Sequence, residues 1–489
     1  MKYQIALAAA LLMSSGVYAE TDSLKTFKAG DRVKAAEING NFTSLDNKID
    51  ALKESVTFDG LDDVFSGTAE EQAGTSAEAA AWDEMKQAYS QVRLPSSNLR
   101  SASSSSDAAC TAANDCVING NRATVTCNGE QGKLASLLKS PDAKAAFLIV
   151  EVIGNCVEDQ LLVTRGAAFF SKNNSGSISA PQVNGNNGKA VVCAAAYCHF
   201  GNITVNGQFE SVRGAILVLQ ENVSINRDFT NLYAGEGSFT VIGKNIDMSG
   251  WIVSESGANI RIYGPDNTAQ RVMIRNTDLT ARPGNGYTSV GLKADMLEII
   301  GGSRVELSND LYSLEDPSLN FSTSAFEFGG VVANHGSYLL LGGNSVSIGG
   351  LAIGSNSHVR LRPLGAFEMT DAAAAGQYPV KGNLSLGQNA TLSLEFSQDI
   401  SIRSLGLREG AGVNFAPTNS AVLSVTDLSV NHGAKVTANS STEKSMTVNG
   451  TLLAYKGAFI QGGVVGLGSS ATTNVSQACA WGNVIDFCD

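Results

Sequence analysis

The sequence reads GSYLLL at residues 336–341 and NSHVRL at residues 356–361. In both segments a Gly or Asn comes first, a small residue comes second, and apolar residues then occupy alternating positions. The phrase recurs between Gly237 and Ile460, with further copies at GANIRI (257–262), GSRVEL (302–307), NATLSL (389–394), GAGVNF (410–415) and GAKV (433–436). Alternation places every second side chain on one side of a β-strand, so each copy predicts a corner followed by a strand.

The spacing of the copies predicts that these strands stack as a solenoid. The leading residues at 336, 356, 389, 410, 433 and 457 lie 20, 33, 21, 23 and 24 residues apart, and the 45 residues from 257 to 302 correspond to two periods. A unit of this length cannot bury its apolar side alone, so it must pack on its neighbours. A leading Gly or Asn tolerates the left-handed backbone of a tight corner.

We therefore expect a mainly β fold, a right-handed parallel β-helix preceded by short amino-terminal helices. At the strand spacing of about 4.8 Å, roughly ten to thirteen coils would form a rod about 50–60 Å long. The alternative is an antiparallel β-sandwich.

The composition agrees with a β protein whose corners are rich in glycine. The 489 residues include 51 Gly and 9 Pro, and the net charge is −12. An acidic surface disfavours nucleic acid and anionic membranes as partners. We expect no nucleic-acid partner, no integral membrane segment, no cofactor and no metal.

The amino terminus predicts export. Residues 1–19 combine the basic Lys2, an apolar core from Ile5 to Met13, and small residues before a cleavage site at Ala19, which is the pattern of a signal peptide. We expect the protein to be secreted or to lie on the cell surface.

Residues 20–95 are expected to be helical and to resemble a coiled coil. Apolar residues spaced 4, 3, 4, 3 and 4 apart form an a/d seam that consists of Ile38, Phe42, Leu45, Ile49, Leu52 and Val56. A helix this short is marginal alone, so the seam must pack against copies of itself or against its own chain. The first alternative predicts a homo-oligomer, with a trimer favoured. A Ser-rich linker at 96–109 follows.

Eight cysteines follow the predicted signal peptide, and none lies in the repeat: Cys110, Cys116, Cys127, Cys156, Cys193, Cys198, Cys479 and Cys488. An even number in an exported chain indicates disulfides. The close pairs Cys193–Cys198 and Cys479–Cys488 are expected bridges. The other four allow three pairings, of which Cys110–Cys116 with Cys127–Cys156 is favoured. Zinc is the rival interpretation, although the chain has no CxxC and only His199 lies near a cysteine.

The β domain is expected to have closed ends. We expect a disulfide-bearing cap at 110–200, repeats at 201–470 and a carboxy-terminal disulfide cap at 471–489. A short helix is predicted from Gly132 to Leu138, just before the first coils. Because an end coil lacks one neighbour, Leu134, Leu137 and Leu138 of this helix are expected to plug the open core.

Several segments carry a resemblance to a known family. They are Val125-Thr126-Cys127, Gly154, Cys156, Glu158, and the run Leu161-Leu162-Val163-Thr164-Arg165. Their order resembles the start of secreted bacterial right-handed parallel β-helix proteins of the pectin-lyase-like superfamily. The phrase from Phe27 to Phe42 is similar to a short module ahead of extracellular domains in such proteins. The resemblance implies a β-helix. It also raises an enzymatic alternative, because this superfamily includes polysaccharide lyases and hydrolases.

Three residues are weak catalytic candidates under that alternative. The triplet Asn276-Thr277-Asp278 is similar to the Asn-Thr-Asp element of polygalacturonases, in which the Asp is a catalytic carboxylate. Asp310 and His335 follow in a compatible order. A hydrolase needs paired carboxylates, but the expected double Asp is only Asn309-Asp310 and no Arg-Ile-Lys follows.

The sequence therefore favours a secreted or cell-surface structural or adhesive β-solenoid. Such a protein would present a long polar face to a glycan or cell-surface ligand. The alternative is a polysaccharide lyase or glycoside hydrolase.

Overall fold

The computed structural model describes residues 116–119, 122–140, 147–183, 186–227, 229–283, 287–308, 323–369, 382–417, 420–438, 446–461, 465–475 and 479–481. All of them belong to one unit, Asp107–Asp489. The predicted signal peptide, the helices of residues 20–95 and the Ser-rich linker lie outside the described residues. So do Asp310 and Cys488.

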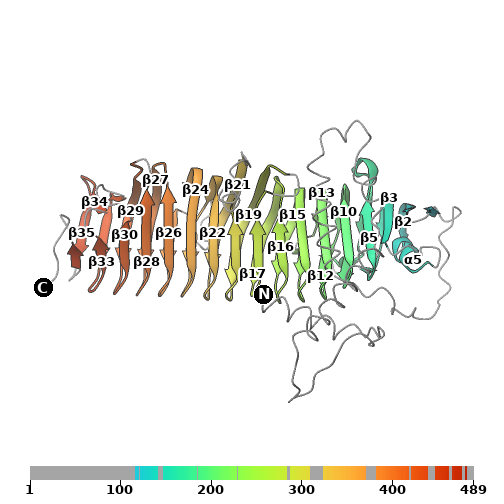
Figure 1. The fold of residues 1–489 in the computed structure, drawn as a ribbon, viewed down its shortest axis with the longest axis horizontal. Helices are drawn as coiled ribbons and strands as arrows, with labels where there is room; N and C mark the ends of the chain where they lie inside the picture. Colours follow the sequence, from blue (N-terminus) through green and yellow to red (C-terminus); the bar gives the residue numbers. More distant parts are fainter. Residues whose placement is uncertain are drawn as a thin grey trace, which may run out of the picture. The chain divides into compact units, whose positions relative to one another are not determined.

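Parallel strands wind into a β-solenoid of about 13 turns, as the spacing of the repeat predicts (Figure 1). Each turn runs through three strand positions, and each position stacks on the same position of the next turn. We call these stacks the first, second and third faces. Several long strands bend at a corner and contribute to more than one face. The parallel stacking of successive turns confirms the prediction of a parallel β-helix.

The first face follows the corner phrase of the repeat. It consists of β2 (Arg122–Gln131), β3 (Phe147–Val157), β5 (Gly166–Phe170), β10 (Tyr197–Gly201), β13 (Ile216–Asn226), β15 (Phe239–Ser254), β16 (Asn259–Ile262), β18 (Asp278–Ala281), β20 (Arg304–Leu307), β22 (Tyr338–Ile348), β24 (His358–Met369), β26 (Thr391–Phe396), β28 (Gly412–Pro417), β30 (Lys435–Ala438), β33 (Phe459–Gln461) and β36 (Cys479–Trp481).

The second face contains the distal parts of β3, β13, β15, β22 and β24. Its other strands are β6 (Ser177–Ser179), β11 (Ile203–Asn206), β17 (Asn267–Arg275), β19 (Ser289–Ile300), β21 (Thr323–Ala333), β27 (Ile400–Leu407), β29 (Leu423–Val430), β31 (Met446–Val448) and β34 (Val465–Leu467).

The third face is completed by the ends of β15, β17, β19, β21, β27 and β29. Its other strands are β4 (Leu161–Val163), β9 (Lys189–Ala194), β12 (Gln208–Val212), β14 (Thr230–Ala234), β23 (Leu351–Ile353), β25 (Asn383–Leu386), β32 (Thr451–Ala454) and β35 (Thr472–Val475).

Two hairpin pairings stand outside the parallel stack. β1 (Cys116–Asn119) pairs antiparallel with β2, and β7 (Gln182–Val183) pairs antiparallel with β8 (Asn186–Asn187). The stretch at residues 173–187 is rich in Asn, Ser and Gly, a composition typical of loops. Only part of it leaves the stack, because β6 lies in the second face with Ile178 fully buried, after a single 3-10 turn, η3 (Lys172–Asn174).

The corner phrase of the repeat has a steric basis in the left-handed backbone. Its leading residue has positive φ in every predicted copy, for example 75° at Gly336, 57° at Asn356 and 54° at Asn389. An L-residue with a larger side chain is disfavoured in this conformation, whereas Gly and Asn adopt it readily. The predicted corners of the repeat are therefore confirmed.

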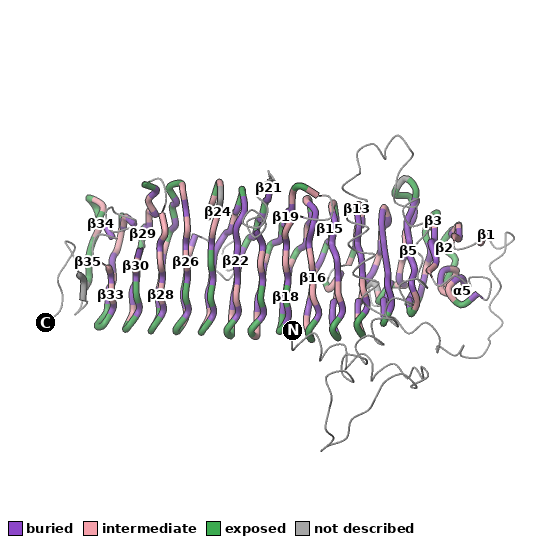
Figure 2. Tube along the Cα trace, in the orientation of Figure 1, coloured by how far each residue is buried: buried purple, intermediate pink, exposed green. Residues whose placement is uncertain are grey.

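The small second residue of the phrase fills the inside of the same corner. These side chains are all at most 2% exposed, namely Ala258, Ser303, Ser337, Ser357, Ala390, Ala411, Ala434 and Ala458. The chain turns sharply around them, so close packing leaves room for only one or two heavy atoms. The alternating residues that follow are buried inward, and they form one continuous core along the rod (Figure 2).

A second corner, between the first and second faces, is held by stacked amides. Asn202, Asn222 and Asn245 have positive φ in three successive turns. The side-chain amide of Asn222 donates to Asn202 Oδ1 at 2.8 Å, and that of Asn245 donates to Asn222 Oδ1 at 3.0 Å. The residue that tolerates the corner therefore also bonds one turn to the next.

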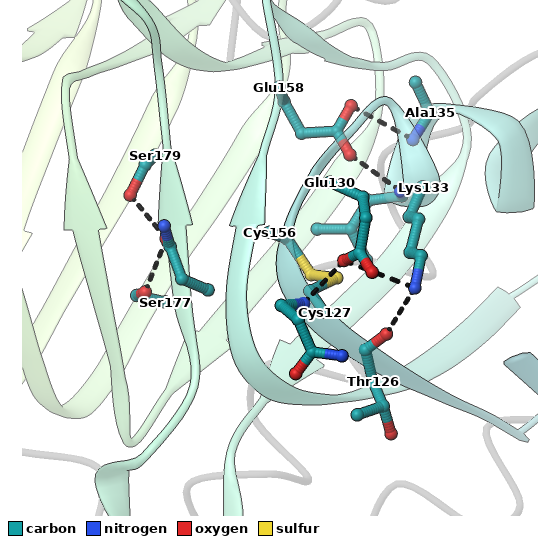
Figure 3. The surroundings of a disulfide bond; sticks show 12 residues. Thr126, Cys127, Glu130, Lys133, Ala135, Cys156, Glu158, Ser177 and Ser179 are labelled. Atoms are coloured by element: carbon teal, nitrogen blue, oxygen red, sulfur yellow. Dashed lines mark hydrogen bonds and ion pairs between the residues drawn. A yellow bond between two sulfur atoms is a disulfide. The ribbon is translucent and has the colours of Figure 1, made fainter. Parts of the chain in front are cut away.

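The amino-terminal end of the core is closed by a helix, as predicted. Helix α5 (Lys133–Lys139) buries Leu134 and Leu137 completely, and Leu138 packs against the edge of the core. The predicted disulfide Cys127–Cys156 links β2 to β3 beside it, with 5.0 Å between the Cα atoms (Figure 3). The Cys193–Cys198 disulfide is also confirmed. Cys116 is disulfide-bonded too, while its predicted partner Cys110 lies outside the described residues.

A carboxylate from the next turn caps helix α5. The residue before the helix is Gly132, which offers no side chain. Instead, Glu158 accepts the backbone N–H of Leu134 at 2.7 Å and that of Ala135 at 3.3 Å (Figure 3). Burial raises the pKa of Glu158 to about 7, although both N–H bonds oppose that shift. This carboxyl therefore titrates near neutral pH.

We predict that the stability of this cap depends on pH through Glu158. Because its pKa in the folded chain lies above the ordinary value of 4.5, the folded state binds the proton more tightly than the unfolded state. The stabilisation is complete below pH 4.5 and is lost as the pH rises through 7, a change of up to about 3 kcal/mol. Amide hydrogen exchange of α5, corrected for intrinsic rates, measures it.

The matched variant is Glu158→Gln, which cannot titrate but keeps one acceptor oxygen. Its α5 opening free energy should be nearly constant over this pH range. Equal pH slopes in the variant and the natural chain would show that Glu158 does not control the cap.

Candidate functional site

The first catalytic candidate, Asp278, belongs to the repeat. Asn276 has φ of 50°, Thr277 is 6% exposed, and Asp278 begins β18 with its side chain outward. Asp278 pairs with Asn259 in the preceding turn and with Arg304 in the following turn. The triplet thus occupies the corner position of GAN at 257–259 and GSR at 302–304, and it supplies the coil that the 45-residue spacing predicts.

The second described candidate, His335, also lies at a corner. It has φ of 57°, is exposed, and precedes Gly336. Tyr338, which follows this corner, lies two strands along the first face from Asp278, about 9.6 Å along the axis. The neighbours of Asp278 in its own ladder are an amide and a guanidinium, so the pairing there is not that of two carboxylates.

The residues of the zinc alternative, His199 and the neighbouring cysteines, have other roles. Both sulfurs of the Cys193–Cys198 pair are in a disulfide. His199 is fully buried, and its ring nitrogens lie 3.2 Å from the Tyr197 hydroxyl and 2.9 Å from Gln220 Oε1. Burial lowers the pKa of His199 to about 3, so its ring is neutral. Within the described ranges, no cluster of three or more His, Cys, Asp or Glu side chains could hold a metal ion.

The outward side of the first face carries charges that pair from turn to turn. The Arg304 guanidinium lies 5.0 Å from the Tyr338 ring centre and forms an ion pair with Glu306. Further along, Glu395 accepts from Arg360 at 2.6 Å and from Arg362 at 3.0 Å. Such pairs link long side chains of adjacent strands, which orders the polar outward side of this face.

The third face has a similar outward network in its amino-terminal turns. The Tyr233 hydroxyl donates to Glu255 Oε1 at 2.8 Å, and Lys189 pairs with Glu210 at 2.7 Å. Burial and the neighbouring Glu255 raise the pKa of Tyr233 to about 12. Its hydroxyl therefore remains a neutral donor.

A cluster of aromatic and planar polar side chains lies where the second face meets the third. Trp251 starts the third-face part of β15, and the Phe229 ring stands edge-on to it with 6.3 Å between ring centres. Arg271, in the next turn, stacks its guanidinium 5.0 Å from the Trp251 ring centre and forms an ion pair with Glu298. The indole N–H of Trp251 donates to Gln270 Oε1 at 3.1 Å. We call these five residues the Trp251 corner.

Sequence reasoning missed the Trp251 corner as a site. The sequence alone does not align Arg271 with Trp251. The signal is weak, because Phe229, Trp251 and Arg271 are 22 and 20 residues apart and come together only through the register of unequal turns.

Comparison of the chain with protein-family models, curated proteins and solved structures gives no match. The fold stands on the strand pairing, and the predicted pectin-lyase-like relationship stays a prediction.

We predict that Asn276 and Asp278 respond to substitution as corner and surface residues. Asn276→Ala should destabilise the chain by about 1–2 kcal/mol, because alanine is disfavoured at positive φ. Asp278→Asn should change the unfolding free energy by less than about 0.5 kcal/mol. Urea denaturation measures both changes, and Asn276→Gly is the control that restores the conformation.

The hydrolase alternative makes the opposite prediction for Asp278. It requires that the natural chain release reducing ends from polygalacturonate and that Asp278→Asn abolish this release. That outcome would show that the triplet is catalytic.

Proposed function

We propose that the protein is a secreted or cell-surface structural or adhesive β-solenoid, which presents a long polar outer surface to a ligand. The observation that carries this proposal is the pairing of outward charges and rings from turn to turn, as in Arg304–Tyr338 and Arg360–Glu395. A rigid, ordered polar surface loses little conformational freedom when it binds. It can therefore hold an extended ligand through many weak contacts.

The disulfides support an extracellular location. Cys127–Cys156 and Cys193–Cys198 both lie in the first turns, and such bonds persist in oxidising compartments. The signal peptide predicted at 1–19 agrees with this location. Among the residues that the structure describes, no helix has the length and apolar character needed to cross a membrane.

The a/d seam of Ile38 to Val56 supports oligomerisation as part of this function. Copies of the seam would bury their apolar stripes in a parallel bundle, with a trimer favoured. Several rods joined at their amino-terminal segments would bind a surface with higher avidity than one rod.

We predict that disrupting the seam separates the oligomer. Leu45→Asp with Ile49→Asp places two charges at seam positions, so the mass of the full chain should fall to that of one subunit. Light scattering after gel filtration measures this. Lys48→Ala, which lies off the seam, should leave the mass unchanged. A natural chain that is already monomeric would contradict the oligomer.

We also predict direct attachment of the rod to a surface. The labelled full-length protein should be retained on cells or on immobilised polysaccharide after washing, and excess unlabelled protein should compete for retention. Absence of specific retention would count against adhesion. Release of reducing or unsaturated ends from the polysaccharide would instead favour the enzymatic alternative.

A further inference from the structure

The Trp251 corner exposes one aromatic ring beside groups that are already fixed in place. Phe229 is 52% exposed. Among the described residues, five other large hydrophobic side chains are exposed, and they lie in the first or last turns: Val117, Ile153, Leu162, Tyr455 and Leu467. Phe229 therefore stands apart from these residues, in a turn away from both ends of the rod, next to Trp251.

The polar groups around this ring are held by contacts within the protein. Arg271 is fixed between the Trp251 ring and Glu298, and its side chain is 32% exposed. Gln270 uses Oε1 to accept the indole N–H, and because its side chain is exposed, the amide N–H groups can reach an outside acceptor. Groups fixed in advance bind with a smaller entropic cost than mobile ones.

We propose that the Trp251 corner binds a pyranose ring of a neutral glycan. The face of an aromatic ring carries a partial negative charge, so it attracts the C–H groups on the less polar side of a sugar ring. The sugar hydroxyls can accept from the amide of Gln270 and the guanidinium of Arg271, and they can donate to the carboxylate of Glu298. Phe229 supplies the apolar contact, and the hydrogen bonds of the planar polar groups fix the orientation of the sugar.

Charge and size decide between ligand classes. Arg271 and Glu298 neutralise each other, so the corner offers no net charge to attract an anionic polymer. A stable protein interface needs about 800 Å² on each partner with an apolar centre, but Phe229 is the one large hydrophobic exposed in this part of the described rod. One exposed ring is enough area for one sugar. This inference rests on the proposed adhesive function and names its ligand class.

The test uses the full-length protein on an array of neutral and acidic oligosaccharides. The natural chain should bind at least one neutral oligosaccharide. Phe229→Ala should weaken that binding about ten-fold through loss of the stacking surface, and Gln270→Ala should also weaken it. Tyr455→Ala removes an aromatic ring that is 40% exposed near the other end of the rod, and it should bind like the natural chain.

The outcomes separate this site from the general function. Retention on cells without binding to any array glycan would overturn the glycan assignment and leave the adhesive function standing. Binding of a protein ligand in place of a glycan would have the same meaning. Equal weakening in Phe229→Ala and Tyr455→Ala would overturn the location of the site. Circular dichroism of each variant shows whether the β-solenoid is retained, and Gln270→Ala tests the site independently at a position outside the core.

Discussion

The left-handed corner between the third and first faces is the constraint on which the structure depends. A residue with positive φ turns the chain, and a buried Ala or Ser then fills the inside of the turn. Because both positions tolerate only small or conformationally permissive residues, each coil begins its first-face strand at the same place. Register follows from the corner, and a shift of one residue would turn every apolar side chain outward. The continuous core is thus a consequence of repeated corners.

A stack held in this way is vulnerable where it ends, since an end coil has a neighbour on one side only. The amino-terminal end is stabilised by α5, the Cys127–Cys156 bond and the capping carboxyl group of Glu158. Each of these links a different pair of elements, so the cap does not depend on hydrophobic contact alone. Its weakest link is electrostatic, because a buried carboxyl is costly to ionise even when two backbone N–H groups face it.

Local features could be predicted from the sequence, because their cause is local. The positive φ at Gly336 and Asn356, the helix around Leu134 and the Cys193–Cys198 bond each depend on a few neighbouring residues. Asn276 shows the limit, since three letters that resemble a catalytic element also fit a corner, and only the pairing of Asp278 with Asn259 and Arg304 places them at one. The sequence gives little sign of strand β6, because polar residues surround its buried Ile178. The Trp251 corner required the register of three turns, which no single segment contains.

The alternation within each strand separates stability from recognition. Inward residues such as Leu279 and Val305 are fully buried and are fixed by packing, whereas their outward neighbours Asp278 and Arg304 meet mainly the same position one turn away. Changes on the outward side therefore cost the fold little, and they alter a surface that repeats along the axis. A site on such a rod need not be a cleft. It can be a short run of adjacent outward positions whose side chains order one another, and the stacking of Arg271 on Trp251 one strand away has this form.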